Sequence, residues 1–191
     1  MINSFISHIN RFVTLSQSEI DILTDSFEPI RLEKKEILHQ TGKVATSKYF
    51  VSKGCLRSYF INDKGIEQIL QFAIENWWIA DYESLERKLP STLYIDAVES
   101  SEILSLTRAK ELELYNRIHN FETYFRQILE RERTAFLTKI RYNFEFTKEE
   151  AYLHFSENFP EFIERIPDYM IASYLNFTPE YLSVIRKRII S

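Results

Sequence analysis

Residues 48–65, KYFVSKGCLRSYFINDKG, hold two strand-like segments and two glycine turns. The segments 48–51 and 55–61 are rich in aromatic and β-branched side chains, which fit a pleated sheet. Ser52-Lys53-Gly54 predicts the turn between them, and Asn62-Asp63-Lys64-Gly65 predicts a hairpin loop after the second. The stretch therefore indicates consecutive antiparallel strands.

The neighbouring sequence extends this pattern over residues 31–108. Residues 67–74 alternate between two faces, as a return strand does. Two later strands are predicted at residues 93–98 and 102–106. All three glycines of the chain fall within this region, where tight turns need them. Strands that are so short and so closely spaced indicate a small barrel or sandwich.

Helices are predicted on both sides of the strands. Residues 1–30 have helical spacing, Ser16 and Glu19 form a capping box, and Pro29 ends the run. From Lys110 onward the spacing is helical again.

A long helix after the strands carries an apolar stripe, which is typical of a helix that packs against a partner. The stripe consists of Phe121, Tyr124, Phe125, Ile128, Ala135, Phe136 and Ile140. Residues 130–133, Glu-Arg-Glu-Arg, interrupt it. Residues 144–168 follow with seven acidic and two basic side chains, so this segment repels phosphate.

The C-terminal residues 166–191 predict two helices joined by a short turn. Pro167 stands at the start of the first helix, where its missing N–H costs nothing. Asn176 tolerates the left-handed backbone of a tight turn. Thr178 can cap the second helix, and Pro179 fits its first turn. This is the pattern of a helix-turn-helix.

The predicted helix pair has an inner and an outer face. Small Ala172 permits close crossing, and the shared core is expected to contain Ile171, Leu175, Leu182 and Ile185. The outer face of the second helix presents Pro179, Glu180, Ser183, Val184 and Lys187. A basic cluster suited to DNA phosphates consists of Arg186, Lys187 and Arg188. The alternative is an ordinary helical hairpin with a solvated basic tail.

Composition excludes several classes of protein. The 191 residues carry a net charge of −4, so nucleic-acid binding requires a local basic patch. The single cysteine, Cys55, excludes a disulfide framework and a cysteine-rich metal site. The sequence shows neither a long apolar run nor a signal peptide, so we expect a cytoplasmic protein.

The sequence shows no catalytic or cofactor motif. Its four histidines are scattered, and it has neither a phosphate-binding glycine loop nor a nucleophile elbow. We therefore expect no enzyme activity, no metal and no cofactor. Trp77-Trp78 could stack on a flat ligand; the alternative places one ring in the core of the strand region and the other under the long helix.

Three segments carry a family resemblance. They are residues 48–59, residues 70–81 with LQFA and ENWWIAD, and residues 166–175 with the following Thr178-Pro179-Glu180. In this order they resemble the cyclic-AMP receptor protein and Fnr (Crp/Fnr) family of bacterial transcription regulators, particularly its short divergent Bacteroidetes-type members.

The resemblance implies an α+β fold in three parts. A cyclic-nucleotide-binding-like β-roll, of the double-stranded β-helix or jelly-roll type, would occupy residues 1–112 as a sensor. A dimerisation helix would follow at residues 113–143, and a helix-turn-helix, winged-helix-like DNA-binding domain at residues 144–191. Any wing must precede the last helix or be missing. The implied partners are double-stranded DNA, a second copy of the chain, and either an unknown small-molecule effector or none.

The effector residues depart from the family pattern. Members that bind cyclic nucleotide carry a Gly-Glu pair for the ribose and an Arg-Ser or Arg-Thr pair for the phosphate. Ala80-Asp81 and Ser91-Thr92 stand at these positions. Without the bidentate arginine the phosphate loses one of its stronger contacts, although Arg87 or Lys88 could substitute. We therefore predict that cyclic AMP does not bind in the usual way.

The second C-terminal helix also departs from the family. Where well-known members place Arg, Glu and Arg against the bases, this chain has Pro179, Glu180 and Val184. Glu180 can accept from a cytosine amino group, and Val184 can contact a thymine methyl. The predicted DNA-contacting residues are Thr178, Pro179, Glu180, Tyr181, Ser183, Val184, Arg186, Lys187 and Arg188. The alternative function is a degenerate sensor or protein-interaction module without specific DNA binding.

Overall fold

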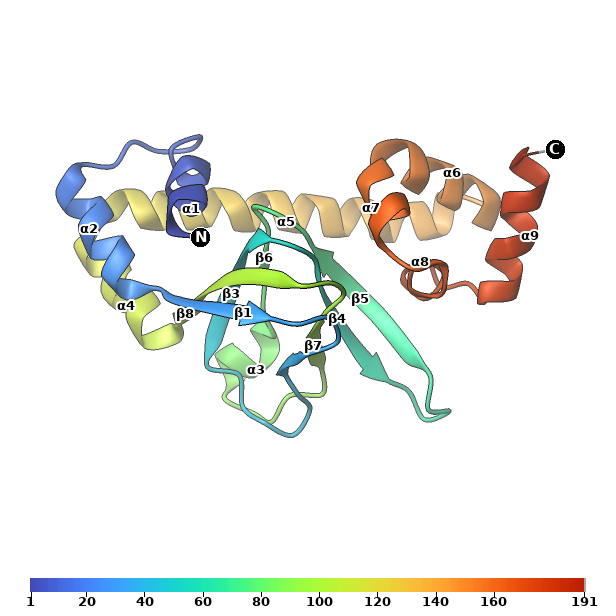
Figure 1. Ribbon diagram of the computed structural model, residues 1–191, viewed down its shortest axis with the longest axis horizontal. Coiled ribbons are helices and arrows are strands. Elements are labelled where there is room, and N and C mark those ends of the chain that lie inside the picture. The colour runs from blue at the N-terminus through green and yellow to red at the C-terminus, as the bar shows by residue number, and fades with distance from the viewer. Residues whose placement is uncertain (191) are drawn as a thin grey trace. The chain divides into compact units, whose positions relative to one another are not determined.

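The computed structural model describes residues 1–190, which divide into two compact units (Figure 1). The roll unit comprises Met1–Phe60 and Leu70–Glu130. The helical unit comprises Ile61–Ile69 and the chain from Arg131 onward. The boundary therefore falls inside the long helix predicted from the sequence.

Two four-stranded antiparallel sheets form the β-roll. The first has the order β1 (Glu28–Leu32), β8 (Ser101–Thr107), β3 (Ser47–Lys53), β6 (Trp78–Ile79). The second has the order β2 (Ile37–His39), β7 (Tyr94–Ala97), β4 (Leu56–Ile61), β5 (Glu67–Ala73). Apolar side chains of both sheets form one buried cluster that includes Val51, Leu56, Ile79, Ile95 and Ile103. The predicted α+β fold with an antiparallel β-roll is confirmed.

Gly54 makes the turn between β3 and β4 possible. Its φ is +98°, a region that L side chains rarely adopt. A Cβ at this position would lie 2.7 Å from the Cα of Ser101 and collide with its side chain. The close approach lets the Ser101 hydroxyl accept a hydrogen bond of 3.2 Å from the backbone N–H of Cys55.

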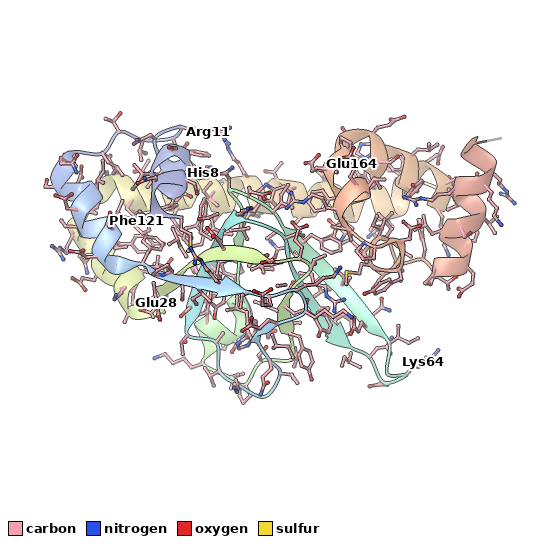
Figure 2. The ribbon with its side chains drawn as sticks, viewed as in Figure 1. His8, Arg11, Glu28, Lys64, Phe121 and Glu164 are labelled. Carbon is pink, nitrogen blue, oxygen red and sulfur yellow. The ribbon has the colours of Figure 1, made fainter. Side chains whose placement is uncertain are left out.

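Four helices and the first sheet enclose an aromatic core. The helices are α1 (Ile2–Ile9), α2 (Gln17–Ser26), α4 (Arg108–Arg117) and α5 (His119–Glu145). Trp78 lies at its centre, donating from Nε1 to Tyr124 Oη at 2.9 Å and packing 4.8 Å from the ring of Phe125. Figure 2 labels His8 and Phe121 in the same core. Trp77, by contrast, is 39% exposed, so the alternative with both indoles buried is wrong.

The N-terminal helices follow the sequence prediction up to their end. Ser16 N–H donates to Glu19 Oε2 at 2.7 Å and Glu19 N–H donates to Ser16 Oγ at 3.4 Å, which confirms the capping box. The predicted helical range nevertheless runs too far. The backbone becomes extended at Phe27, and residues 28–32 pair with β8 as an edge strand, a position that tolerates a proline.

The long helix predicted from Lys110 is two helices. Ile118 separates α4 from α5 in an extended conformation, and its side chain is fully buried. The predicted stripe divides as well. Its first part is buried in the aromatic core and consists of Phe121, Tyr124, Phe125 and Ile128. Its second part is exposed and consists of Ala135, Phe136 and Ile140.

The helical unit contains the end of α5 and four shorter helices (Figure 1). These are α6 (Lys148–Asn158), α7 (Pro160–Arg165), α8 (Asp168–Tyr174) and α9 (Pro179–Ile190). Among residues 131–190, the structure places none in a strand, so no wing occurs within that range. The tip of the β4–β5 hairpin, where Figure 2 labels Lys64, belongs to this unit. Ser173 Oγ of α8 donates to the carbonyl of Glu67 at 2.8 Å and accepts from the N–H of Ile69 at 3.1 Å.

Candidate nucleic-acid interface and effector site

A tight turn joins α8 to α9. Asn176 adopts φ +60°, the left-handed conformation that the sequence predicts. The N–H of Phe177 then donates to the carbonyl of Ala172 at 2.7 Å. Thr178 Oγ1 accepts from the N–H of Tyr181 at 3.2 Å, which confirms the predicted cap of α9.

The two faces of α9 differ as predicted. Of the predicted core residues, Ile171, Leu182 and Ile185 are at most 1% exposed, as is Ala172. Leu175, also predicted to lie in this core, is only partly buried at the end of α8. The exposed side chains of α9 include Pro179, Glu180, Ser183, Val184 and Lys187. Tyr181 is 37% exposed beside them. The helix thus presents a mixed polar and apolar surface that is open to a partner.

Two cations of the predicted basic cluster already have partners. Arg186 donates from Nε to Tyr152 Oη at 2.8 Å and from Nη1 to Asp168 Oδ2 at 2.7 Å. Arg188 donates from Nη1 to Glu149 Oε1 at 2.6 Å. Arg186 therefore connects α9 to α6 and α8, and Arg188 connects α9 to α6. Lys187 is exposed.

A further cation, absent from the sequence prediction, lies beside the start of α9. Lys148 is exposed, and its Nζ lies 5.2 Å from the ring centre of Tyr181 and 5.8 Å from that of Phe177. The sequence places Lys148 in an acidic segment, which hid it. The capping box of Thr147 and Glu150 is the local signal that fixes it in the first turn of α6.

The predicted effector residues lie around α3 (Tyr82–Arg87). The Asp81 carboxylate caps this helix, since Ser84 N–H donates to its Oδ1 at 3.0 Å. Its other oxygen accepts from Ser91 Oγ at 2.5 Å. Ala80 is buried beside them. Two of the predicted effector residues, Asp81 and Ser91, are thus hydrogen-bonded to each other.

The remaining predicted effector residues face solvent. Arg87 pairs with Glu83 one turn earlier at 3.0 Å, and both side chains are more than half exposed. Thr92 is exposed. The fold therefore brings together Ala80, Asp81 and Ser91 and leaves Arg87 and Thr92 outside that group.

The roll also buries polar side chains that the sequence prediction missed. Arg57 on β4 donates to both carboxylate oxygens of Asp96 on β7, at 2.8 and 2.9 Å, and lies 4.2 Å from the ring centre of Tyr59. His39 on β2 has a buried Nε2 without a hydrogen-bond partner among the described residues. Burial lowers the pKa of His39, and the Asp81 carboxylate partly offsets this effect.

Comparison with known proteins identifies the roll. Residues 29–117 match the family model of the cyclic nucleotide-binding domain. This segment is therefore similar to a cyclic nucleotide-binding domain. No curated protein matches the chain in sequence.

Solved structures extend the likeness beyond the cyclic nucleotide-binding domain. CLP of Xanthomonas campestris is 10% identical, with 91% of each chain covered and a TM-score of 0.73. FixK2 of Bradyrhizobium japonicum is 17% identical over 85% of this chain and 84% of the other, with a TM-score of 0.69. A Crp/Fnr regulator of Eubacterium rectale, described as putative, is 16% identical over 91% and 83%, with a TM-score of 0.67. The chain therefore has the Crp/Fnr fold, as its sequence resemblance implies.

The predicted effector residues and the buried arginine have hydrogen-bond partners within the chain. Both carboxylate oxygens of Asp81 accept hydrogen bonds, one from Ser84 N–H and the other from the Ser91 hydroxyl. Arg57 is the only buried arginine among residues 1–190, and it donates to both carboxylate oxygens of Asp96. Arg57 and Asp96 lie 39 residues apart in the sequence, so no local pattern could have revealed their pairing. No three histidine, cysteine, aspartate or glutamate side chains in the described part of the chain are grouped to hold a metal.

Proposed function

We propose that the chain is a DNA-binding transcription regulator, acting as a homodimer, with a cyclic nucleotide-binding domain that does not hold cyclic AMP in the usual way. The observation that carries the proposal is the exposed outer face of α9, on a chain with the Crp/Fnr fold. A helix that buries one face in its own unit and presents the other can enter a major groove. No step of this function requires catalysis.

Specific contacts would come from side chains on the exposed face of α9. Glu180 can accept from a cytosine amino group, and Val184, 44% exposed, can contact a thymine methyl. Thr178, Tyr181 and Ser183 lie on the same helix or at its cap and can reach base edges or sugar and phosphate oxygens. The preferred sequence would therefore differ from one recognised by paired arginines.

The second half of α5 supports a dimer. Its exposed apolar side chains are Leu129, Phe136, Leu137, Ile140 and Phe144, with Phe136 63% and Phe144 84% exposed. Aromatic side chains left in water at this density are usually buried by a partner. A second copy would cover the same stripe and present two α9 helices for half-sites about 34 Å apart.

The arrangement of the predicted effector residues supports the proposal that cyclic AMP does not bind in the usual way. A cyclic phosphate needs a cation, but Ser91 stands where the family has arginine, and its hydroxyl donates to Asp81. Arg57 would have to leave a doubly hydrogen-bonded, buried carboxylate, and breaking such a pair is costly. Arg87 is more than half exposed and paired with Glu83.

The rival function is a sensor or interaction module without specific DNA binding. The pairing of Arg186 with Asp168 and of Arg188 with Glu149 favours it, because these carboxylates reduce the positive field of α9. Selection of duplexes from a random pool distinguishes the two. The proposed function predicts enrichment of a two-fold symmetric site; the rival predicts no enriched sequence and weak binding that salt abolishes equally for all duplexes.

A further inference from the structure

The segment that opens α9 carries a pair of aromatic rings with a lysine beside them. Phe177 and Tyr181 lie 6.0 Å apart at an interplanar angle of 80°. Lys148 Nζ lies within 6 Å of both ring centres. The cation comes from the first turn of α6 and the rings from the start of α9, so the fold positions a positive charge beside the exposed face of α9.

The acidic neighbours of Lys148 in the sequence are engaged elsewhere. Glu149 accepts from Arg188 at 2.6 Å. Glu150 accepts from both the N–H and the hydroxyl of Thr147, each at 2.8 Å. Lys148 itself takes part in no ion pair within residues 1–190. Its charge therefore remains available to an anion, whereas the charges of Arg186 and Arg188 are directed at carboxylates.

The two aromatic rings restrict the Lys148 side chain before an anion binds. A lysine side chain loses much rotamer freedom when it binds an anion, and rings that attract the ammonium group reduce that loss by holding it in place. The ammonium group remains exposed, and three N–H donors are well suited to a phosphate as a point charge.

We propose that Lys148 contacts a DNA phosphate beside the α9 helix, while Arg186 holds α9 to α6 and α8 within the helical unit. This inference rests on the proposed DNA-binding function and adds a residue to it. Lys148 lies on α6 and not on α9, so its partner is the duplex backbone that flanks the groove. A backbone contact strengthens binding to every sequence and specifies none.

The test compares Lys148→Gln, Lys148→Arg and the control Lys34→Gln, an exposed lysine in the roll unit. Binding to a random-sequence duplex and to a selected duplex is measured by fluorescence anisotropy over a series of salt concentrations. Lys148→Gln should weaken binding to both duplexes by roughly tenfold or more and lower the salt slope by about 1.8, the value for one phosphate contact in each of the two subunits. Lys148→Arg should retain most of the affinity, and Lys34→Gln should match the wild type.

Two results would overturn the inference, and they are distinguishable. If the wild type binds the selected duplex and Lys148→Gln leaves both affinity and slope unchanged, Lys148 makes no phosphate contact although the proposed function holds. If the wild type binds no duplex at all, the proposed function fails and the inference fails with it. Amide hydrogen exchange of α9 in Lys148→Gln should match the wild type, which separates lost contact from lost structure.

Discussion

The Arg186 guanidinium lies 2.7 Å from the Asp168 carboxylate and ties α9 to the first residue of α8. The same side chain donates to Tyr152 of α6. One cation thus connects three helices, and its side chain is only 29% exposed. We expect this contact to help hold α9, and with it the direction of its outer face.

We expect Arg186→Ala to weaken the attachment of α9 to α6 and α8. The variant loses one ion pair and one hydrogen bond at a half-buried site, worth about 1 kcal/mol. Amide hydrogen exchange of α9 should then be about fivefold faster. The control is Arg188→Ala, which removes a more exposed pair and should leave exchange nearly unchanged. Equal exchange rates in wild type and Arg186→Ala would show that the contact does not hold the helix.

Cyclic AMP should give no measurable binding heat at micromolar concentration. The reason is the hydrogen bond between Ser91 and Asp81, the two residues predicted to stand at the phosphate and ribose positions, together with the arginine that the prediction finds missing. Isothermal titration of the full chain measures this directly. A micromolar dissociation constant would contradict the prediction that these residues do not hold cyclic AMP.

A buried ionic network joins β3 to α4. Glu111, which is fully buried, accepts hydrogen bonds from Lys48 at 2.5 Å, Tyr115 at 2.6 Å and Arg108 at 2.7 Å. Burial raises the pKa of Glu111, but the hydrogen bonds outweigh burial and hold this pKa below its ordinary value of 4.5. Ionised Glu111 therefore stabilises the fold above about pH 4.5, and this contribution disappears as the pH falls through the lower folded-state pKa.

Glu111→Gln should destabilise the roll unit by about 3 kcal/mol at neutral pH, because the buried Lys48 loses the charge of the carboxylate that it contacts. Urea denaturation followed by the fluorescence of buried Trp78 measures the loss. The difference from wild type should shrink below pH 4.5, where the wild-type carboxylate is itself protonated. Glu113→Gln, which alters an exposed pair with Arg117, serves as the control. A difference that stays constant into acid would rule out the linkage.

Phe136→Glu should convert the proposed dimer into a monomer. The substitution places a charge in the exposed stripe of α5, where a partner chain would have to desolvate it. Light scattering after gel filtration reports the mass. Thr134→Glu adds the same charge to α5 outside the stripe and should leave the mass unchanged. A wild type that is monomeric at working concentration would contradict the proposed dimer.

Local patterns in the sequence predicted what local interactions decide. The capping box of Ser16, the left-handed Asn176 and the cap at Thr178 are each formed by residues within a few positions of one another, so they were predicted correctly. The break at Ile118 was missed because burial in the tertiary core, and not helix propensity, determines it.

Contacts between distant residues could not be predicted. Arg57 and Asp96 are neighbours only because β4 pairs with β7, and Arg186 reaches Asp168 only when α8 and α9 cross. The sequence therefore indicated which residues belong to the candidate DNA-binding surface, but not that Arg186 and Arg188 have carboxylate partners. The same limitation hid Lys148, whose aromatic neighbours lie about thirty residues later in the printed sequence.

The most direct test concerns Glu180, at the exposed start of α9. Dissociation constants of wild type and Glu180→Gln are measured for the selected duplex, for each of its single-base variants and for a random duplex. We expect Glu180→Gln to lose about 1–3 kcal/mol of discrimination at one base pair in each half-site without weakening binding to the random duplex. Unchanged discrimination at every position, or a wild type that binds the selected and random duplexes equally, would contradict the claim that the outer face of α9 recognises base edges.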